Sequence, residues 1–341
     1  WWQEADKPWQ ALAWCKEWAE YNIARANGES YETRLPCASD GSCNGLQHLS
    51  AMLRDLEGGK AVNLTPSDEP QDIYADVAKR ATELLEEDGS EMAMHLLNIG
   101  ICSKLTKRSV MIVPYSGTRH ACRDYIMEAL EDKCTGNNPW GDDFFEASMV
   151  LAGFVWQAIG DVIVSAFSAM QYIKDVAKLY VDNGIPFTWT TPTNLIVRQF
   201  YTDRKSKRIK THIAGSLVAL RYYEDMGDKI DSRKTLSGAS PNFVHSLDAA
   251  ALTMTVHECL KDGILDYAMV HDSYGTHSPN MPRLNQRLRE AFVVMYQEHD
   301  VLLNLYEDAV VSLPEGTLVP APPSKGDLDL TQVLQSDYFF A

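Results

Sequence analysis

The chain has 341 residues, of which 45% are hydrophobic and 23% charged, so it can bury a large core. Its net charge of −16 argues against non-specific nucleic-acid binding, because most such affinity comes from Lys and Arg neutralising phosphates. The longest uncharged apolar stretch, residues 147–160, is too short to span a membrane as a helix. The seven scattered cysteines form no CxxC pair, so we expect reduced thiols.

Hydrophobic periodicity predicts more helix than strand. Helices are expected over residues 8–26, 44–53, 71–87, 104–113, 143–181 and 242–259. Strands are expected over residues 34–38, 187–191, 195–201, 267–270 and 274–276, the last two forming a β-hairpin. The predicted fold class is therefore α+β.

Two aspartates follow predicted strands. Asp40 lies at a corner between a strand and a helix, and Asp272 lies in the turn of the last hairpin. Two carboxylates held close together repel unless they are protonated or bridged by cations. Magnesium prefers such oxygen ligands, so the pair suits two-metal phosphoryl transfer. Taken singly, each aspartate is more typical of a turn.

A cationic helix lies between these two corners in the sequence. The spacing i, i+4, i+8 places Lys107, Met111 and Tyr115 on one helical face, with Arg108 beside the lysine. Such a face can bind a nucleotide, with the two cations on the triphosphate and Met111 against a base. The alternative is a solvated Lys-Arg turn on a core helix, with Met111 and Tyr115 packed inside.

The order of these elements resembles the single-subunit RNA polymerases of T-odd bacteriophages, which are related to the mitochondrial enzyme. The likeness runs from Trp1 to Ala341, and as a set in fixed order its motifs are highly specific. They are residues 40–48, 50–55, 61–64, 71–74, 106–115 and 241–246, the His271-Asp272 hairpin and residues 336–341.

The resemblance implies a mostly helical polymerase right-hand fold with a small antiparallel palm sheet. Residues 1–70 and 236–341 correspond to the palm, the first part carrying the Asp40 corner and the second the His-Asp hairpin. Residues 71–140 correspond to fingers with the nucleotide-binding helix. Residues 141–235 correspond to further fingers and a promoter-reading loop.

The resemblance also implies a two-magnesium site. Asp40, Asp272 and the carbonyl of Gly41 match the ligands of the two ions. Lys107 matches a triphosphate-binding lysine that can donate a proton, and Arg108 matches a second phosphate contact.

Further positions match residues that read the sugar and the DNA. Tyr115 matches the residue that favours ribonucleotides, and His245 the one that senses the 2′-hydroxyl, while His271 is expected to support the metal corner. A buried, hydrogen-bonded histidine remains the alternative for both histidines. Arg208 and Lys210 lie in the basic segment where phage enzymes carry the promoter-reading loop, with an ordinary solvated hairpin as the alternative.

Two positions depart from the family pattern. The family usually has Arg four residues before the lysine and Gly directly after the tyrosine, where this chain has Ser103 and Ser116. Lys104 and Gly117 are nearby residues that can replace the missing charge and the missing glycine. The departures concern nucleotide handling rather than the metal chemistry.

The implied function is synthesis of RNA from nucleoside triphosphates on a DNA template and promoter, in the cytoplasm of a phage-infected bacterium. The N-terminal and thumb portion of the family precedes the part resembled, so we expect it as a fused segment or a separate chain. A family A DNA polymerase is the first alternative, but Gly41-Ser-Cys and Ser273 stand where those enzymes carry glutamates. A non-catalytic DNA-binding subunit is the second, and intact Asp40, Lys107, Tyr115 and Asp272 argue against it.

Overall fold

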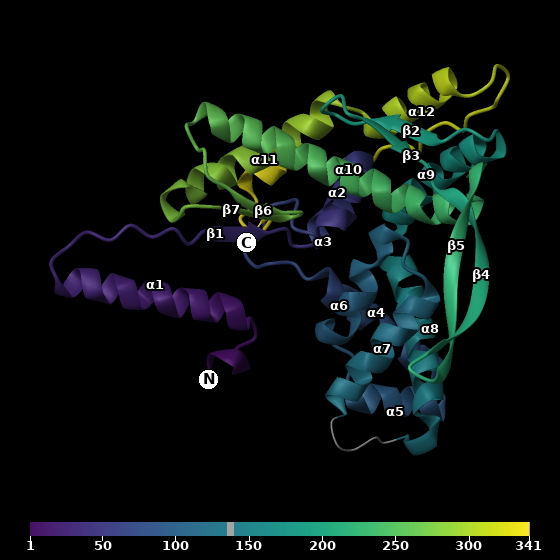
Figure 1. Cartoon of the computed structure of the whole chain (residues 1–341), viewed down its shortest axis with the longest axis horizontal. Helices are drawn as coiled ribbons and strands as arrows, with labels where there is room; N and C mark the ends of the chain where they lie inside the picture. The colour runs from purple at the N-terminus through teal and green to yellow at the C-terminus, as the bar shows by residue number, and fades with distance from the viewer. Residues whose placement is uncertain (135–139, 341) are drawn as a thin grey trace.

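The computed structural model describes residues 1–134 and 140–340, a mostly helical α+β chain with small antiparallel sheets (Figure 1). This confirms the predicted fold class. The expected boundary at residue 140 adjoins residues 135–139, which lie outside the described part. The α-helices are α1 (Pro8–Ala26), α2 (Asn44–Leu53), α3 (Leu56–Ala61), α4 (Ile73–Asp88), α5 (Glu91–Ile99), α6 (Ser103–Met111), α7 (Arg119–Lys133), α8 (Phe144–Val162), α9 (Val164–Asp182), α10 (Ser232–Lys261), α11 (Met281–Glu298) and α12 (Val301–Ser312).

The strands form three separate antiparallel sheets. In the first, β1 (Cys37–Asp40), β7 (Ser273–Thr276) and β6 (Ala268–Val270) lie in that order. The second joins β2 (Phe187–Thr190) to β3 (Ile196–Gln199), and the third is a long hairpin of β4 (Thr202–Ile213) and β5 (Ser216–Ile230). Short 3₁₀ helices occur at η1 (Trp2–Glu4), η2 (Val113–Tyr115), η3 (Gly141–Asp143), η4 (Ser278–Asn280) and η5 (Leu330–Gln335).

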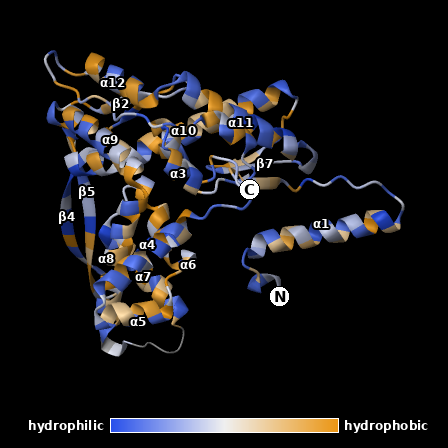
Figure 2. Cartoon of the chain, turned by 180° about the vertical axis from the view of Figure 1, so that it is seen from behind, coloured by the Kyte–Doolittle hydropathy of each residue, from blue (hydrophilic) through white to orange (hydrophobic). Residues whose placement is uncertain are grey.

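The elements gather into two bodies that share one core. Helices α4 to α8 form a helical unit, and the β1-β7-β6 sheet lies with α2, α10 and α11 on the other side (Figure 1). The completely buried α2 packs against α9 and α10, so it connects the sheet to the core. The β4–β5 hairpin runs along the helical unit, and α1 stands apart from the rest of the chain in both cartoon views (Figures 1 and 2).

Local sequence explains where several helices begin. The Asp72 carboxylate accepts hydrogen bonds from the amides of Tyr74 and Ala75 at the start of α4, and Asp231 accepts one from Lys234 at the start of α10. Such side chains satisfy amides that have no partner within the helix. Among the described residues all seven cysteines are free thiols, as predicted.

The structure corrects several predicted boundaries. The first strand is Cys37–Asp40 rather than residues 34–38, so Asp40 is itself the last strand residue. The single helix expected over residues 143–181 is two helices, α8 and α9, bent by 90°. Helix α10 begins at Ser232, ten residues earlier than expected, and continues through Pro241.

Other helices escaped prediction altogether. These are α3, α5, α7, α11 and α12, of which α11 has a well-defined buried face. Among the described residues, no single helix is long and apolar enough to cross a membrane, and only the bent pair α8 and α9 meets that test together.

Candidate active site

The sheet brings the two predicted metal ligands together. Strand β1 pairs with β7 so that Asp40 lies opposite Ser273, and the amide of Gly41 donates a hydrogen bond to the carbonyl oxygen of Asp272 (3.2 Å). Asp272 lies in the tight turn between β6 and β7, next to His271, which has a positive φ of 54°. Main-chain pairing therefore fixes two carboxylates at one end of the sheet.

The electrostatics of this corner suit a hard cation. Burial raises the pKa of Asp272, and the neighbouring Asp40 carboxylate raises it further, so the ionised pair repel each other. Among the described residues no cluster of three Asp, Glu, His or Cys side chains surrounds a common point. Two carboxylates, with substrate phosphates completing the shell, are a common arrangement for magnesium. The donor set thus fits this ion.

Residues 338–340, near the end of the chain, pack against the segment that directly follows Asp40. Gly41 forms a β-bridge with Phe340, and the hydroxyl of Ser42 donates to the carbonyl of Tyr338 (2.5 Å). The Gln47 amide donates to the carbonyls of Phe339 (2.9 Å) and Val62 (3.0 Å). This packing shows why the motifs at residues 40–48 and 336–340 occur together, although almost 300 residues separate them.

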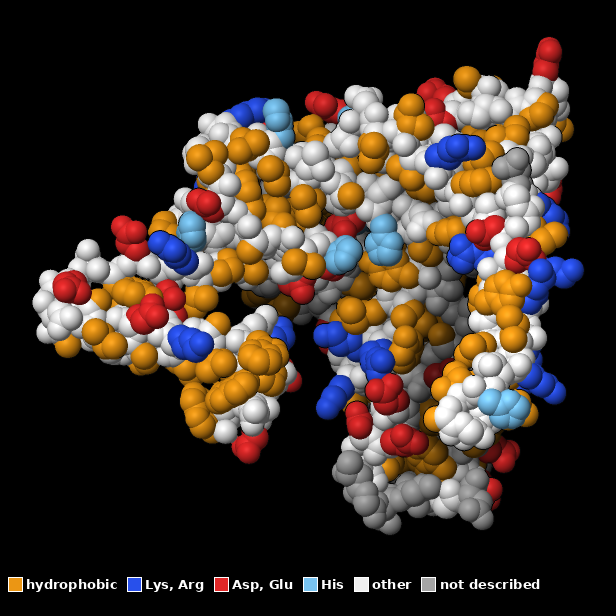
Figure 3. All heavy atoms as spheres, in the orientation of Figure 1, with side chains coloured by type: hydrophobic (Ala, Val, Ile, Leu, Met, Phe, Trp, Pro, Cys, Tyr) orange, Lys and Arg blue, Asp and Glu red, His pale blue; other side chains and the backbone are white. Residues whose placement is uncertain are grey.

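Helix α6 presents its cations on two different sides. The Lys107 ammonium lies 5.5 Å from the centre of the Tyr74 ring. Arg108 instead turns toward α7, where its guanidinium pairs with Glu128 (2.5 Å) and lies 4.3 Å from the centre of the Tyr125 ring. Lys and Arg side chains gather on this edge of the helical unit, facing the sheet (Figure 3). Of these two cations, Arg108 is neutralised by Glu128, whereas Lys107 has no ion pair among the described residues.

Lys107 and Met111 lie four residues apart within α6 and so share a helical face, as predicted, but Tyr115 does not, which corrects that part of the prediction. Helix α6 ends at Met111, and Pro114 lies within the following 3₁₀ turn. This turn places the Tyr115 ring against His245 of α10, with ring centres 4.6 Å apart and planes at 16°. Met111 is 45% exposed, which excludes the core position that was its alternative.

The two histidines lie near the same corner. The ring centres of His245 and His271 are 6.5 Å apart, so the Tyr115–His245 stack lies beside the turn that carries Asp272. Partial burial lowers the pKa of His245, which favours its neutral form near pH 7. Neither residue is fully buried, so neither is the buried core histidine considered as the alternative.

Gly45 allows Tyr115 to approach α2. A β-carbon at this position would lie 2.7 Å from Cβ of Pro114 and 3.1 Å from the Tyr115 hydroxyl oxygen. Any larger residue would therefore displace the turn that carries the tyrosine. Close packing against Pro114 and Tyr115 thus explains why the second glycine of the motif DGSCNGLQH, Gly45, is present.

A buried polar network beneath the site was missed by sequence reasoning. Asp248 of α10 accepts a hydrogen bond from the Asn44 amide (2.9 Å) and lies 3.9 Å from Nε2 of His48. Burial opposes ionisation of Asp248, but the nearby His48 ring and the hydrogen bond from Asn44 outweigh it, so the pKa of Asp248 is lowered. His48 also contacts the Tyr296 hydroxyl (2.6 Å). The sequence offered little signal, because Asp248 is one of several charged residues on α10, which also carries Lys234 and Glu258.

Ser103 and Ser116, the two positions that depart from the family pattern, lie in different surroundings. The Ser103 hydroxyl donates to the carboxylate of Asp72 (2.7 Å), which connects the starts of α6 and α4. Lys104 lines a pocket of about 360 Å³ between α6 and α7, together with Lys107 and Arg108. Ser116 has the left-handed φ of 59° that favours glycine, and its hydroxyl oxygen is buried with no hydrogen-bond partner among the described residues.

Arg208 and Lys210 lie on the β4–β5 hairpin, away from the metal corner (Figure 1). Arg208 faces Arg221 across the strands, and Lys210 faces Ala219. Neighbouring cations are paired, as in Arg204 with Asp225 and Lys207 with Glu224, but neither Arg208 nor Lys210 has an ion pair within the described chain. The hairpin therefore presents unneutralised positive charge to solvent.

Comparison with known proteins agrees with this geometry. The family model described as DNA-dependent RNA polymerase matches residues 1–319. The DNA-directed RNA polymerase of Enterobacteria phage K11 is 34% identical over 389 aligned positions, covering all of this chain and 42% of the phage protein. T7 RNA polymerase of Escherichia phage T7 is 33% identical, with 43% of its length covered.

A mitochondrial relative matches equally well. DNA-directed RNA polymerase 1 of Nicotiana sylvestris mitochondria is 34% identical over the whole of this chain, which covers 34% of that protein. The chain thus spans less than half the length of these curated relatives. From the match of the family model over most of its length, the chain belongs to the single-subunit DNA-dependent RNA polymerase family.

Proposed function

We propose that this chain carries the catalytic part of an RNA polymerase, which transfers ribonucleotides from nucleoside triphosphates to an RNA 3′ end on a DNA template. The observation that carries the proposal is the pairing of β1 with β7, which places Asp40 next to Asp272. Residues 1–70 and 236–341 would form the palm of a right-hand fold, and residues 71–140 and 141–235 the fingers and promoter-reading region.

Asp40, Asp272 and the carbonyl of Gly41 would hold two magnesium ions. When bound, these ions make the RNA 3′-hydroxyl a better nucleophile and neutralise the charge that develops on the leaving pyrophosphate. The chain contributes a fixed position for both carboxylates, because each belongs to a paired segment of the same sheet. His271, directly before Asp272, would support the turn that presents the carboxylate.

Lys107 would bind the triphosphate and protonate the leaving pyrophosphate. Lys107 is exposed, its ammonium lies 5.5 Å from the centre of the Tyr74 ring, and it has no ion pair among the described residues. Arg108 would add a second phosphate contact after exchanging Glu128 for the ligand, and the exposed Met111 would offer apolar contact to a base.

Tyr115 and His245 would select the sugar. Their stacked rings form a rigid wall, and burial raises the pKa of the Tyr115 hydroxyl, so it remains a protonated hydrogen-bond donor at neutral pH. A neutral His245 can accept a hydrogen bond from a 2′-hydroxyl. A deoxyribose could not make that contact, and the site would therefore favour ribonucleotides.

Arg208 and Lys210 would contact promoter DNA from the β4–β5 hairpin. A two-stranded ribbon can enter the major groove, and these cations have no competing ion pair within the described chain. The net charge of −16 does not oppose this role, because the charge that matters is local.

We further propose that α1 docks onto the N-terminal and thumb portion, whether fused or separate. Trp9, Trp14 and Trp18 are 76%, 57% and 52% exposed, an unusual amount of aromatic surface for one helix. The curated relatives have more than half of their length outside the region matched by this chain. Since phage enzymes are among these relatives, the infected bacterial cytoplasm is the proposed location.

Primer extension on an RNA-primed DNA template, with the N-terminal and thumb portion present, tests the proposal. Asp272→Asn and Asp40→Asn should abolish extension, whereas the control Asp266→Asn, which removes an exposed carboxylate at the base of the same hairpin, should not. Tyr115→Phe should narrow the preference for ribonucleotides while retaining the stacked ring. Extension that survives in Asp272→Asn would refute the two-metal assignment.

A further inference from the structure

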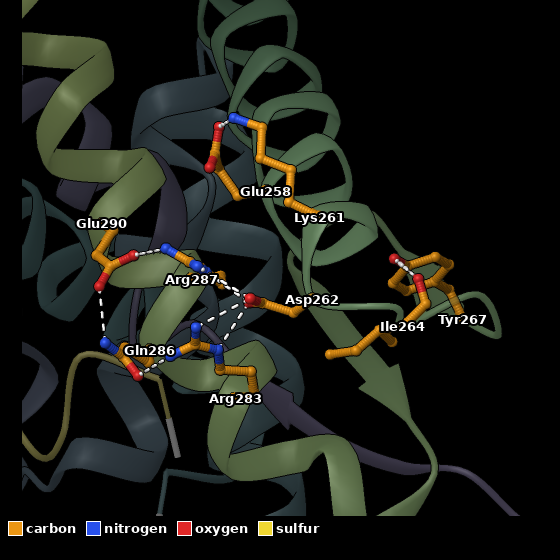
Figure 4. Close-up of polar contacts among 9 residues, drawn as sticks. All are labelled: Glu258, Lys261, Asp262, Ile264, Tyr267, Arg283, Gln286, Arg287 and Glu290. Atoms are coloured by element: carbon orange, nitrogen blue, oxygen red, sulfur yellow. Dashed lines mark hydrogen bonds and ion pairs between the residues drawn. The ribbon is translucent and has the colours of Figure 1, made fainter.

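An ion-pair cluster joins the end of α10 to the start of α11. Asp262, the residue directly after α10, accepts two hydrogen bonds from Arg283, at 2.7 and 2.9 Å, and two from Arg287, at 2.6 and 3.0 Å (Figure 4). Each guanidinium group therefore makes a bidentate contact with the same carboxylate. This geometry is stronger and more directional than a single contact.

The two arginines are themselves held in place. Gln286 accepts a hydrogen bond from Arg283 (2.9 Å) and donates one to Glu290 (2.8 Å), which in turn accepts one from Arg287 (2.7 Å). The ring of contacts in Figure 4 fixes both side chains on α11. Isolated surface ion pairs contribute little, but the Asp262 and Arg287 side chains are only 16% and 21% exposed and form a network.

The cluster closes a loop that carries the candidate metal ligand. Residues 263–282 lie between Asp262 and Arg283, and they contain β6, the turn with Asp272 and β7. A second contact closes the same loop nearer its tip, where the Thr276 hydroxyl donates to the carbonyl of Asp266 (2.7 Å). Anything that loosens the base of this loop will therefore increase the motion of its tip.

The hairpin needs such an anchor because its sheet is small. Strand β6 has three residues and forms an edge, with Val270 67% exposed, and β1 on the other side has four residues. Sheets of this size are marginally stable unless they pack against something else.

We propose that Asp262, bound by Arg283 and Arg287, is a positioning residue that holds the β6–β7 hairpin so that Asp272 remains beside Asp40. The proposal rests on the function proposed above. It assigns the cluster a role in the metal site, although none of its members contacts that site. The competing explanation is a surface network that adds stability to the α10–α11 junction and nothing more.

Amide hydrogen exchange of the polymerase containing this chain separates these explanations. In Asp262→Asn, amides of residues 266–276 should exchange about tenfold faster, while those of α4 and α8 remain unchanged. Arg283→Gln leaves the Arg287 pair intact and should give a smaller increase, and Asp262→Glu should restore much of the protection. The control Glu258→Gln removes an exposed pair with Lys261 one turn away and should change nothing.

Binding of Mn²⁺ in the absence of nucleotide, followed by electron paramagnetic resonance, gives the second measurement. Asp262→Asn should weaken Mn²⁺ binding several-fold, and excess Mg²⁺ should restore extension without a change in the KM for nucleotide. Unchanged exchange at residues 266–276, faster exchange throughout the chain, or unchanged Mn²⁺ affinity would each overturn the proposal. Wild-type protein that binds no Mn²⁺ at Asp272 would instead refute the proposed function itself.

Discussion

Asp40 and Asp272 lie together because the amide of Gly41, directly after Asp40, donates a hydrogen bond to the carbonyl of Asp272. The contact is part of the β1–β7 pairing, so the main chain rather than the side chains sets the position of both carboxylates. Side-chain substitution at either position should therefore change the chemistry of the corner while leaving its backbone intact.

Asp272→Asn should lower the rate of extension by at least about 100-fold, because metal coordination contributes several kcal/mol to such reactions. The same change should leave the melting temperature equal or higher at pH 7. The folded state raises the pKa of Asp272, so it favours the uncharged form that Asn resembles. Calorimetry checks the second expectation, and a marked loss of stability would contradict it.

Ser116→Gly should stabilise the protein by about 1 kcal/mol, because the left-handed backbone costs a non-glycine residue roughly that amount. The change also removes a buried hydroxyl that lacks a partner among the described residues. Urea unfolding measures the gain. Gly117→Ala is the matched opposite, since its β-carbon would lie 2.5 Å from Cγ1 of Ile112 and should destabilise the turn.

Gly45→Ala should disturb the sugar-selecting pair without touching a metal ligand. The added methyl group would lie 2.7 Å from Cβ of Pro114, and such overpacking typically costs about 1–3 kcal/mol. We expect lower stability, together with a weaker preference for ribonucleotides because Tyr115 shifts against His245. Competition between ribonucleotides and deoxyribonucleotides tests this, and unchanged selectivity in a folded, destabilised variant would contradict it.

The wild type should have a larger free energy of unfolding than Asp262→Asn at neutral pH, and this difference should shrink as the pH falls. Hydrogen bonds from Arg287 and Arg283 hold the pKa of Asp262 well below its usual range. A lowered folded-state pKa gives stability that is fully present above the unfolded value, near pH 4, and is lost as the pH falls below it. Urea titrations from pH 7 to pH 3 should show the gap shrinking only at the acid end, whereas a gap that widens there would be inconsistent.

The local sequence pattern was sufficient to predict many of the helices and strands, and also the protein family. Asp40 at a strand end, the helix at residues 44–53 and the hairpin around Asp272 follow from residues within a few positions of each other, because turns, caps and periodicity are short-range effects. The order of the motifs also indicated the polymerase family that the comparisons show.

Features that depend on distant residues required the tertiary structure. Helix α10 continues through Pro241 because Ala239 and Phe243 on either side are buried, and that burial compensates for the lost hydrogen bond. Tyr115 leaves the expected helical face because Pro114 lies in a 3₁₀ turn that packs on Gly45.

The polar networks show the same limit. Asp248 with His48, and Asp262 with its two arginines, look like ordinary surface charges in the sequence. Their partners lie up to 200 residues away, and only the folded chain brings them within 4 Å. The amino-acid order thus determined which chemistry is present, while packing decided which side chains meet to perform it, because burial and long-range pairing have no local signal.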